Sequence, residues 1–249
     1  MSPAEQVSPP LFTCHAFSHP PKVELAAAPY LCPAAIQVKV DQVWQTQRQQ
    51  RGEALTDGPL YHLAEISPQQ LLIQPSRYRY YVARLHNPHW AEQGLSIQPL
   101  AVTALLHCQD GIILGQRSEH VITNPLHWEL APAGGVNQPD PQGALYEELR
   151  EELGLQAEQC HASTLLGLVG NRENGVHDLL YKLSTNLNAQ AIMQSQQQRG
   201  TQEYQQLACL PPDQLPSFLK KHRHHVVPEL IPMLTLAQLL PPSFSLSQA

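Results

Sequence analysis

The chain has 249 residues, of which 42% are hydrophobic, and it carries 15 Lys and Arg against 21 Asp and Glu, a formal net charge of -6. A chain of this length buries a core as one large domain or two small ones, and no apolar run approaches the roughly 20 residues of a membrane helix, which excludes an integral membrane protein. The negative net charge argues against the broad positive field of nucleic-acid binding, so neither nucleic acid nor a membrane is an expected partner.

The cysteines and the first residues bear on the cellular compartment. Five cysteines are widely scattered and form no Cys-x-x-Cys pair, which fits neither a disulfide framework nor a thiolate zinc site. The first residues show no basic segment followed by an apolar stretch, so no secretory signal is expected. Both observations favour a cytoplasmic location.

Residues 1–98 are predicted to form an N-terminal α+β extension. Residues 1–33 are rich in Pro and Ala without a period, which predicts an extended or loosely packed lead segment. The segment from Pro33 to Gly52 opens with a proline, has apolar residues at helical spacing and ends at a glycine, which predicts an amphipathic helix. The runs YHLAEISPQQLLIQ and YRYYVARL then predict two or three short strands, and residues 87–99 resemble a linker.

Residues 99–245 are predicted to form a second domain. The apolar runs LAVTALLHC and GIILGQR are joined at Asp110-Gly111, which favours a β-hairpin. A Gly-rich corner follows at Trp128–Gly135, and then a helix with a leucine stripe from Gln142 to Gly154. LLGLVGN, DLLYKLS and QQLACL predict further strands, and the tail from about Leu215 predicts helices interrupted by prolines.

Three glutamates share one face of the leucine-striped helix. Glu148, Glu151 and Glu152 stand at positions i, i+3 and i+4, so their side chains are expected to converge. Neighbouring carboxylates repel one another unless a cation neutralises them, and oxygen ligands suit Mg²⁺ or Mn²⁺. The alternative is the solvated acidic face of an ordinary helix. The Gly-Gly corner just before the helix favours a metal site, because it lets a backbone carbonyl or a phosphate come close.

The segment GGVNQPDPQGALYEELREELGL resembles a degenerate Nudix box, whose usual form is G-x5-E-x7-R-E-U-x-E-E-x-G-U with U aliphatic. Glu148 matches the Glu after the Arg, Glu151-Glu152 the metal-binding pair and Gly154-Leu155 the closing pair. Two features depart from the pattern. Glu147 occupies the arginine position, and the segment from Gly135 to the helix is two residues shorter, which leaves no glutamate at the first Glu position. In the family this arginine helps to orient the catalytic glutamate.

The resemblance implies a Nudix fold, in which a mixed sheet lies between helices as an α-β-α sandwich, here preceded by the N-terminal extension. It also implies hydrolysis of a nucleoside diphosphate linked to a group X, with Mg²⁺ or Mn²⁺ as cofactor and a small nucleotide as substrate. The alternative is a nucleotide-binding module of the same fold that has lost catalysis, which Glu147 and the shortened segment favour.

One subgroup resembles more of the chain, namely the UDP-sugar-hydrolysing Nudix proteins of animals and plants. The matching features are QVWQTQRQ, PLYHLAEI and SRYRYY, the last with the pair Tyr78-Arg79. This likeness implies that UDP-glucose or a similar nucleotide sugar is split into UMP and a sugar 1-phosphate.

Two sets of residues are expected at the site. The resemblance implies four catalytic carboxylates, of which the first three bind metal, at Glu148, Glu151, Glu152 and Glu203. The predicted substrate-binding residues are Arg79, Arg117, Arg172, Gly134 and Gly135. Guanidinium forks match phosphate oxygens, and a glycine carbonyl would add a metal ligand. The alternatives are surface ion pairs for the arginines, a stacked structural pair for Tyr78-Arg79, and a plain surface position for Glu203.

Overall fold

The computed structural model describes residues 10–246, so the first nine residues of the predicted lead segment lie outside the described part. The strands are β1 (Phe12–Ala16), β2 (Lys22–Leu25), β3 (Pro59–Ile66), β4 (Gln70–Arg77), β5 (Leu100–Cys108), β6 (Gly111–Arg117), β7 (Trp128–Leu130), β8 (Ala133–Gly135), β9 (Cys160–Asn171), β10 (His177–Thr185) and β11 (Tyr204–Leu210). The α-helices are α1 (Ala34–Arg51), α2 (Tyr78–His86), α3 (Pro141–Leu153), α4 (Ala189–Arg199), α5 (Leu215–Lys221) and α6 (Leu230–Leu236).

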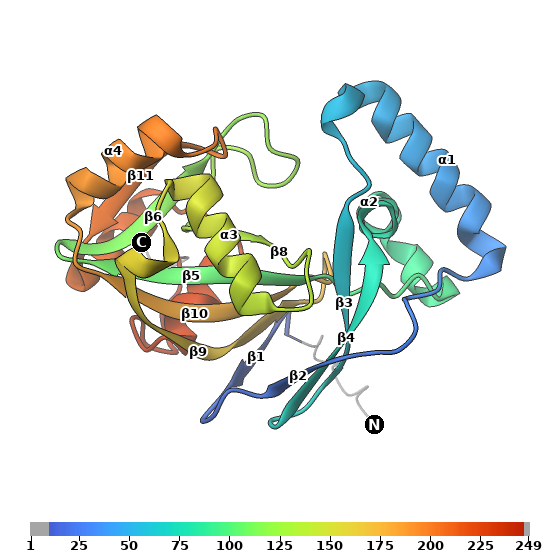
Figure 1. Ribbon diagram of the computed structural model, residues 1–249, viewed down its shortest axis with the longest axis horizontal. Helices are drawn as coiled ribbons and strands as arrows, with labels where there is room; N and C mark the ends of the chain where they lie inside the picture. Colours follow the sequence, from blue (N-terminus) through green and yellow to red (C-terminus); the bar gives the residue numbers. More distant parts are fainter. Residues whose placement is uncertain (1–9, 247–249) are drawn as a thin grey trace, which may run out of the picture.

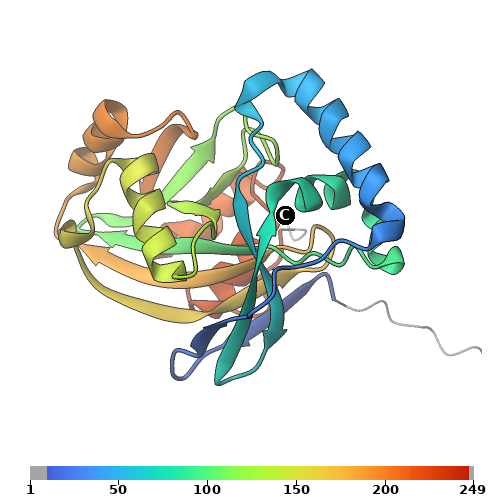
Figure 2. The same ribbon diagram turned by 45° about the vertical axis from the view of Figure 1, so that its right-hand side comes forward.

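Two sheets organise these elements (Figure 1). The larger is 8-stranded, in the order β1-β9-β10-β5-β6-β11, with β7 paired to β6 and β8 paired to β5. It is mixed, because β10 runs parallel to β5 whereas β9, β6 and β11 pair antiparallel with their neighbours. The smaller sheet is 3-stranded, in the order β2-β4-β3, and lies beside α1 and α2 (Figure 2).

Helices cover both faces of the large sheet, because its strands alternate apolar side chains between two cores. On β5, Val102 and Leu106 pack in the core that contains the leucines of α3, whereas Leu105 packs in the core formed with α5 and α6. The same alternation on β10 places Leu179 and Leu180 in different cores. The predicted fold class, a mixed sheet between helices with an added N-terminal region, is therefore confirmed.

Most predicted elements of residues 99–245 are present. The hairpin of β5 and β6, the helix α3 and the strands β9, β10 and β11 fall where the apolar patterns place them. In the extension, α1 buries Ile36, Val40 and Trp44 at the expected helical spacing. Two of the expected strands are present as β3 and β4, which pair antiparallel.

The strand predicted for YRYYVARL is wrong, since these residues form helix α2. Tyr78, Tyr81 and Leu85 lie three and four residues apart and pack in one cluster with Leu60 and Ile97. This is helical spacing, and the contacts it makes outweigh the preference of tyrosine and valine for strands.

The segments predicted to be loose or to link domains are also more ordered than expected. In the lead segment, β1 pairs antiparallel with β9 and β2 pairs parallel with β4. Residues 87–99 include a 3-10 helix, η2 (Pro88–Gln93), and bury Trp90, Leu95 and Ile97, so they pack into the protein rather than forming an open linker. The division into residues 1–98 and 99–245 stays a prediction, and β1 already belongs to the sheet of the second part.

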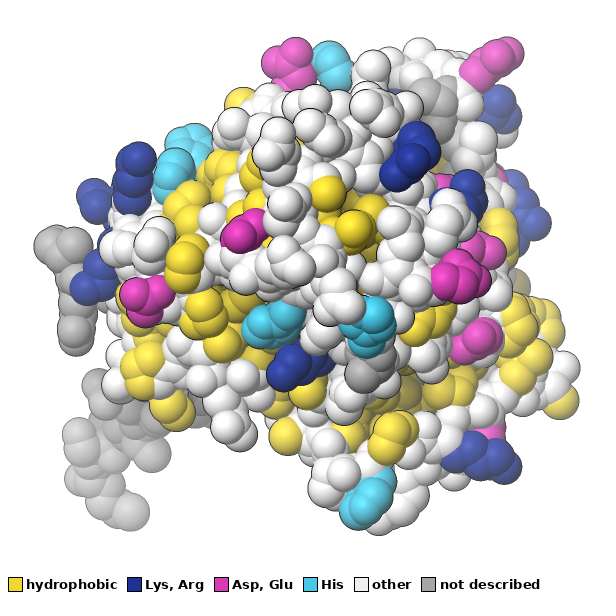
Figure 3. Space-filling view, turned by 60° about the vertical axis from the view of Figure 1, so that its left-hand side comes forward, with side chains coloured by type: hydrophobic (Ala, Val, Ile, Leu, Met, Phe, Trp, Pro, Cys, Tyr) yellow, Lys and Arg dark blue, Asp and Glu magenta, His cyan; other side chains and the backbone are white. Residues whose placement is uncertain are grey.

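Charged side chains are sparse, since they make up 14% of the residues. On the face shown in Figure 3, acidic and basic side chains are interspersed among a larger uncharged area, as the 14% content of charged residues leads one to expect. Among the helices of residues 10–246, none combines the length and the apolar character needed to span a membrane.

Candidate active site

Helix α3 is held in place at both ends. The side chain of Asp140 caps its first turn by accepting a hydrogen bond from the backbone N–H of Gln142 at 3.1 Å, and Pro141 occupies the first helical position, where no N–H is needed. The helix ends at Gly154, which has φ 66, a left-handed value that glycine adopts without strain. The helix packs on the sheet through a fully buried stripe of Leu145, Leu149 and Leu153.

The three predicted metal ligands on α3 do not share one environment. Glu152 is buried and Glu148 is half-buried, and both lie one turn apart on the side of the helix that faces the sheet. Glu151 is exposed and pairs with Arg150, with 2.7 Å between Arg150 Nη2 and Glu151 Oε1. The structure therefore brings two of the three carboxylates toward the Gly-Gly corner and leaves the third at the surface.

The Gly-Gly corner of β8 lies directly against these two carboxylates. The backbone N–H of Ala133 donates to Glu152 Oε2 at 3.0 Å. A β-carbon on Gly134 would overlap the carboxylate of Glu148, whereas a β-carbon on Gly135 would meet nothing within 4 Å. The first glycine of the corner is thus required by the position of Glu148, and the second is not.

The carboxyl groups of Glu148 and Glu152 lie close together without a cation, and each of them is harder to ionise than an exposed glutamate. Burial, together with repulsion from the carboxylates of Glu151 and Glu203, raises the pKa of Glu148 to about 7. Burial also raises the pKa of Glu152 well above its ordinary value, with added repulsion from Glu148 and Glu129. Among the described residues, no Lys, Arg or His forms an ion pair with Glu148 or Glu152. A bound cation would stabilise this arrangement.

Arg117, at the end of β6, connects two further carboxylates. Its guanidinium lies 2.5 Å from Glu129 Oε1 and 3.2 Å from Glu203 Oε1, and its Nε donates to the carbonyl of Thr123 at 3.1 Å. Burial raises the pKa of Glu129 to about 7, although Arg117 acts in the opposite direction. Arg117 therefore holds Glu129 and Glu203 beside the carboxylates of α3.

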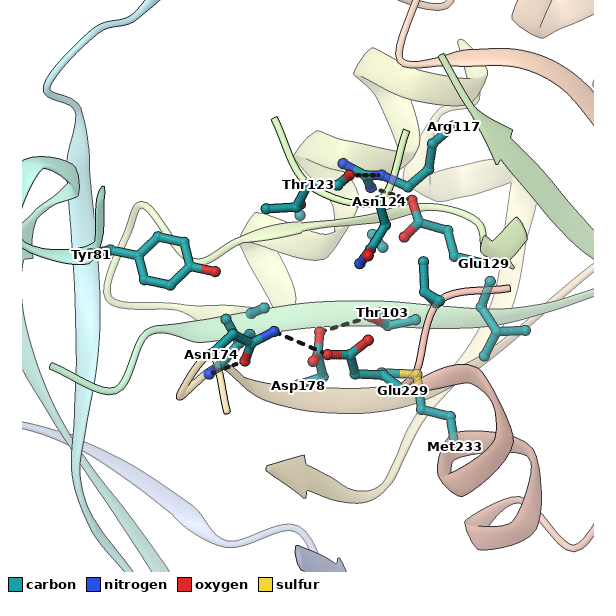
Figure 4. Close-up of a pocket in the computed structure, with 16 residues that line it drawn as sticks. Tyr81, Thr103, Arg117, Thr123, Asn124, Glu129, Asn174, Asp178, Glu229 and Met233 are labelled. Carbon is teal, nitrogen blue, oxygen red and sulfur yellow. Dashed lines mark hydrogen bonds and ion pairs between the residues drawn. The ribbon is translucent and has the colours of Figure 1, made fainter. Parts of the chain in front are cut away.

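Two cavities meet at Arg117. The first, which we call the acidic cavity, measures about 170 Å³, and its lining includes Arg117, Glu129, Gly134, Asp178, Glu229 and Tyr81. Figure 4 shows Arg117 and Glu129 above Asp178 and Glu229, with Tyr81 to the left. The second, which we call the loop cavity, measures about 700 Å³. It lies between the extension, which contributes Arg51, Leu55 and Tyr78, and the segments around Arg117–Thr123 and Thr201–Glu203.

The other predicted substrate-binding residues lie in different places. Arg79 pairs with Asp57 at 2.5 Å and with Asp41 at 3.3 Å inside the extension, and its guanidinium carbon lies 5.8 Å from the Trp44 ring centroid. Arg172 is exposed just after β9. Neither of them lines the acidic cavity or the loop cavity.

Sequence reasoning missed Glu129, Asp178, Glu229 and Tyr81. Glu129 stands inside the apolar run WELA, and a charged residue in a buried strand is costly unless it has a partner or a function. That signal was available for Glu129. For Asp178, Glu229 and Tyr81 there was no such signal, because they come from β10, from the residue before α6 and from the helix mispredicted as a strand.

The carboxylate oxygens at this site are suitable ligands for a hard divalent cation, although the side chains are not spaced as a complete ligand set. Within residues 10–246, no three His, Cys, Asp or Glu side chains are close enough together to form a ligand set. Glu148 and Glu152 are nevertheless carboxylates without a cationic partner, next to the backbone of Gly134 and Ala133 respectively, and oxygen donors of this kind suit Mg²⁺ and Mn²⁺. The chemistry of the site fits such an ion.

The comparison with protein families identifies the class. The NUDIX domain model matches residues 98–230, which include the corner, helix α3 and all strands of the large sheet except β1. The chain belongs to the NUDIX domain family. It is accordingly a hydrolase of the Nudix type, which acts on diphosphate bonds and in general uses divalent metals. No curated protein matches the chain.

Solved structures of Nudix proteins resemble parts of the chain. The MutT protein of Methanosarcina mazei Go1 is 17% identical over 56% of this chain and 91% of its own, with a TM-score of 0.41. A C. elegans Ap4A hydrolase is 19% identical over 55% and 92%, with a TM-score of 0.36. A bifunctional NMN adenylyltransferase/ADP ribose pyrophosphatase from Francisella tularensis is 16% identical over 66% and 48%, with a TM-score of 0.42.

Proposed function

We propose that this protein is a Mg²⁺-dependent pyrophosphohydrolase that cleaves a nucleoside diphosphate linked to X, with a nucleotide sugar such as UDP-glucose as substrate and UMP and a sugar 1-phosphate as products. The observation that carries the proposal is the pair Glu148 and Glu152, a half-buried and a buried carboxyl group without a cationic partner, which contact the corner at Gly134 and Ala133. A diphosphate is a polyanion, and its hydrolysis at this place requires a positive charge that the two carboxylates would recruit.

Glu148 and Glu152 would hold Mg²⁺ or Mn²⁺, with Glu151 and a carbonyl of Gly134 or Gly135 as further ligands. Such an ion, when bound, neutralises phosphate charge and lowers the pKa of a water molecule. We assign Glu203 as a further ligand or as the general base that accepts a proton from the attacking water. Its carboxylate is 35% exposed and acts electrostatically on both Glu148 and Glu152, which suits a group that meets water.

Arg117 is the proposed contact to a phosphate group. It lines both cavities and is fixed by Glu129, so its guanidinium is already oriented when a substrate arrives. A phosphate at this point would compete with the half-exposed Glu203 for Nη2 of Arg117. Arg172 remains a predicted phosphate contact, and Arg79 a predicted contact from the extension.

The proposal of a nucleotide sugar rests on the resemblance of the extension to UDP-sugar hydrolases. The loop cavity supports a contribution from the extension, because Arg51, Leu55 and Tyr78 form one of its walls. A substrate with two bulky ends around the diphosphate would extend from the site into both cavities. The cytoplasmic location also stays a prediction.

The direct test is turnover on a panel of nucleoside diphosphate sugars with Mg²⁺, measured as phosphate released after coupling to a phosphatase. We expect turnover of at least one substrate and a loss of about 100-fold or more in Glu152→Gln, because the variant removes one charged ligand. The matched control is Glu147→Gln, which removes an exposed glutamate from the same helix. No turnover of any substrate, or equal turnover by Glu152→Gln and the wild-type protein, would contradict the proposal.

The second candidate is a nucleotide-binding module without catalysis. Glu147, which stands at the arginine position of the box, is exposed on α3, so no arginine of the box is present to orient Glu148. Calorimetry separates the two functions, because tight nucleotide binding without product would favour the module.

A further inference from the structure

The acidic cavity contains a pair of buried carboxyl groups that cleavage of a diphosphate does not require. Asp178 on β10 and Glu229 just before α6 are each 9% exposed and both line the cavity (Figure 4). The hydroxyl of Thr103 donates to Asp178 Oδ1 at 3.2 Å. The side-chain amides of Asn171 and Asn174 donate to Glu229 Oε1 at 2.6 Å and 3.1 Å. These bonds use one oxygen of each carboxyl group, so the second oxygen of each is left for a ligand.

No cation offsets this pair. Within residues 10–246, neither Asp178 nor Glu229 takes part in an ion pair. Buried carboxyl groups are costly unless hydrogen-bond donors satisfy their oxygens. A ligand that brings donors into the cavity would therefore gain more here than at an exposed surface.

Tyr81 points to a ligand independently of the acidic pair. It is 8% exposed, it comes from α2 in the extension, and its hydroxyl is directed into the acidic cavity (Figure 4). Among the described residues, the hydroxyl of Tyr81 has no hydrogen-bond partner. The hydroxyl is not one of the fully buried polar atoms that lack a partner, so it is open to the cavity and is placed to bond with a molecule there.

The charges decide which part of a substrate fits here. Phosphate oxygens would be repelled by the carboxylate of Glu229 and attracted by Arg117, so the diphosphate belongs on the side of the cavity where Arg117 lies. The opposite side then receives an uncharged group that offers hydrogen-bond donors. Two donors on neighbouring atoms match two acceptor oxygens that face the same space.

We propose that the acidic cavity binds the uncharged end of the substrate through two adjacent hydrogen-bond donors, which Asp178 and Glu229 accept while the hydroxyl of Tyr81 makes a third contact. This inference rests on the proposed hydrolysis of a nucleoside diphosphate linked to X. Adjacent donors occur on the vicinal hydroxyls of a sugar and on the N–H edge of a base such as guanine, and the same carboxyl groups would recognise either.

The experiment compares substrates that differ by one donor. UDP-glucose against UDP-2-deoxyglucose removes a sugar hydroxyl, and GDP-glucose against IDP-glucose removes the amino group of guanine. We expect one of these pairs to differ by about 10- to 100-fold in kcat/KM with the wild-type protein, because a lost partner leaves a buried acceptor unsatisfied. The pair that differs identifies whether the sugar or the base enters the cavity.

The variants test the three residues. Asp178→Asn, Glu229→Gln and Tyr81→Phe are each expected to raise KM about tenfold or more for the preferred substrate, with a smaller change in kcat, and Asp178→Asn is expected to shrink the difference within the substrate pair. Glu173→Gln, which removes an exposed carboxylate near the cavity, is the matched control. If Asp178→Asn fails to fold, Tyr81→Phe retains the ring and still reports on the cavity. Unchanged KM in folded variants, or no difference within either substrate pair, would overturn the proposal.

Calorimetry keeps this inference separate from the proposed hydrolysis. If the wild-type protein hydrolyses none of these compounds, binding of UDP-glucose and GDP-glucose is measured directly. Binding that weakens tenfold or more in Asp178→Asn would support the cavity while the proposed hydrolysis fails. Absent binding, or binding that Asp178→Asn leaves unchanged, would overturn the cavity as well.

Discussion

The carboxylate of Glu148 occupies the space next to the α-carbon of Gly134 in which any other residue would place its side chain. The corner and helix α3 come this close because position 134 has no β-carbon. The backbone of β8 and the carboxylates of α3 thus form one surface. The position of Glu148 depends on Gly134, which has no side chain.

Gly134→Ala should therefore displace Glu148 without removing it. We expect a loss of about 100-fold in kcat, because a shift of the order of 1 Å in a positioned group has this effect. The matched variant is Gly135→Ala, whose β-carbon meets nothing within 4 Å. Its loss should be at least tenfold smaller. Equal losses in the two variants, measured by phosphate release, would show that the contact with Glu148 does not matter.

Glu152→Gln should be more stable than the wild-type protein without a divalent ion and less stable than it when the ion is present. Without the ion the variant should melt at a higher temperature than the wild-type protein, because it removes a buried carboxyl group that Glu148 and Glu129 repel. With Mn²⁺ at 100 times its Kd the wild-type protein should gain about 2.7 kcal/mol, a rise in Tm of about 5–10 °C, and the variant should lose most of this gain.

Thermal melting with and without the ion measures both effects. Glu147→Gln, on the same helix and exposed, should keep the full rise in Tm. A wild-type Tm that does not respond to Mn²⁺ would count against a metal site at α3.

Arg117 and Glu129 should show strong energetic coupling. Their side chains are 14% and 12% exposed, and removing one partner leaves the other charge buried, so Arg117→Met should lower the free energy of unfolding by about 3–5 kcal/mol. The double variant with Glu129→Gln should recover part of this loss. The exposed pair Arg150 and Glu151, at 53% and 52%, should contribute about 0–1 kcal/mol. Urea unfolding of both double-mutant cycles checks this, and equal coupling in the two pairs would contradict it.

The stability of the protein should fall as the pH rises past 4 toward 8. Burial raises the pKa of Asp178 to about 8, with a further contribution from Glu229, against about 4 in an unfolded chain. The folded state therefore binds the proton more tightly, and the stability that this proton provides is full below pH 4 and is lost as the pH rises through 8.

Asp178→Asn should remove this part of the pH dependence. Urea midpoints at pH 5 and pH 8 should differ less in the variant than in the wild-type protein, whereas Glu173→Gln should leave the difference unchanged. The same slope in all three proteins would mean that Asp178 titrates like an exposed acid.

The elements that could be predicted from the sequence are those with a strong local pattern. Helix α3 is predicted by a leucine stripe and a terminal glycine, and the hairpin of β5 and β6 by a turn between two apolar runs. The α-β-α architecture followed from a resemblance carried by the same helix. The misassigned YRYYVARL contains residues that favour strands at a spacing that favours a helix, and only its contacts with Leu60 and Ile97 decide between them.

The surroundings of the site could not be predicted in the same way. Pairing between distant segments sets them: the register places Asp178 beside Ala101 and Glu129 beside Gly115. The mutual repulsion of Glu148 and Glu152 likewise depends on burial by other elements, which the spacing along one helix does not determine. The difference in burial between the exposed Glu151 and the more buried Glu148 and Glu152 results from the packing of α3 on the sheet.

The pairing of β1 with β9 has a consequence for the way the chain is divided. Phe12 lies opposite Asn171 and Ala16 opposite Gly167. Strand β1 is therefore synthesised early but can pair only after β9 has been synthesised much later. A fragment starting at residue 99 would retain helix α3 but leave one edge of β9 with unpaired backbone amides and carbonyls. An uncovered edge of this kind is a template for self-association, so expression of the isolated second half should give aggregates that the intact chain avoids.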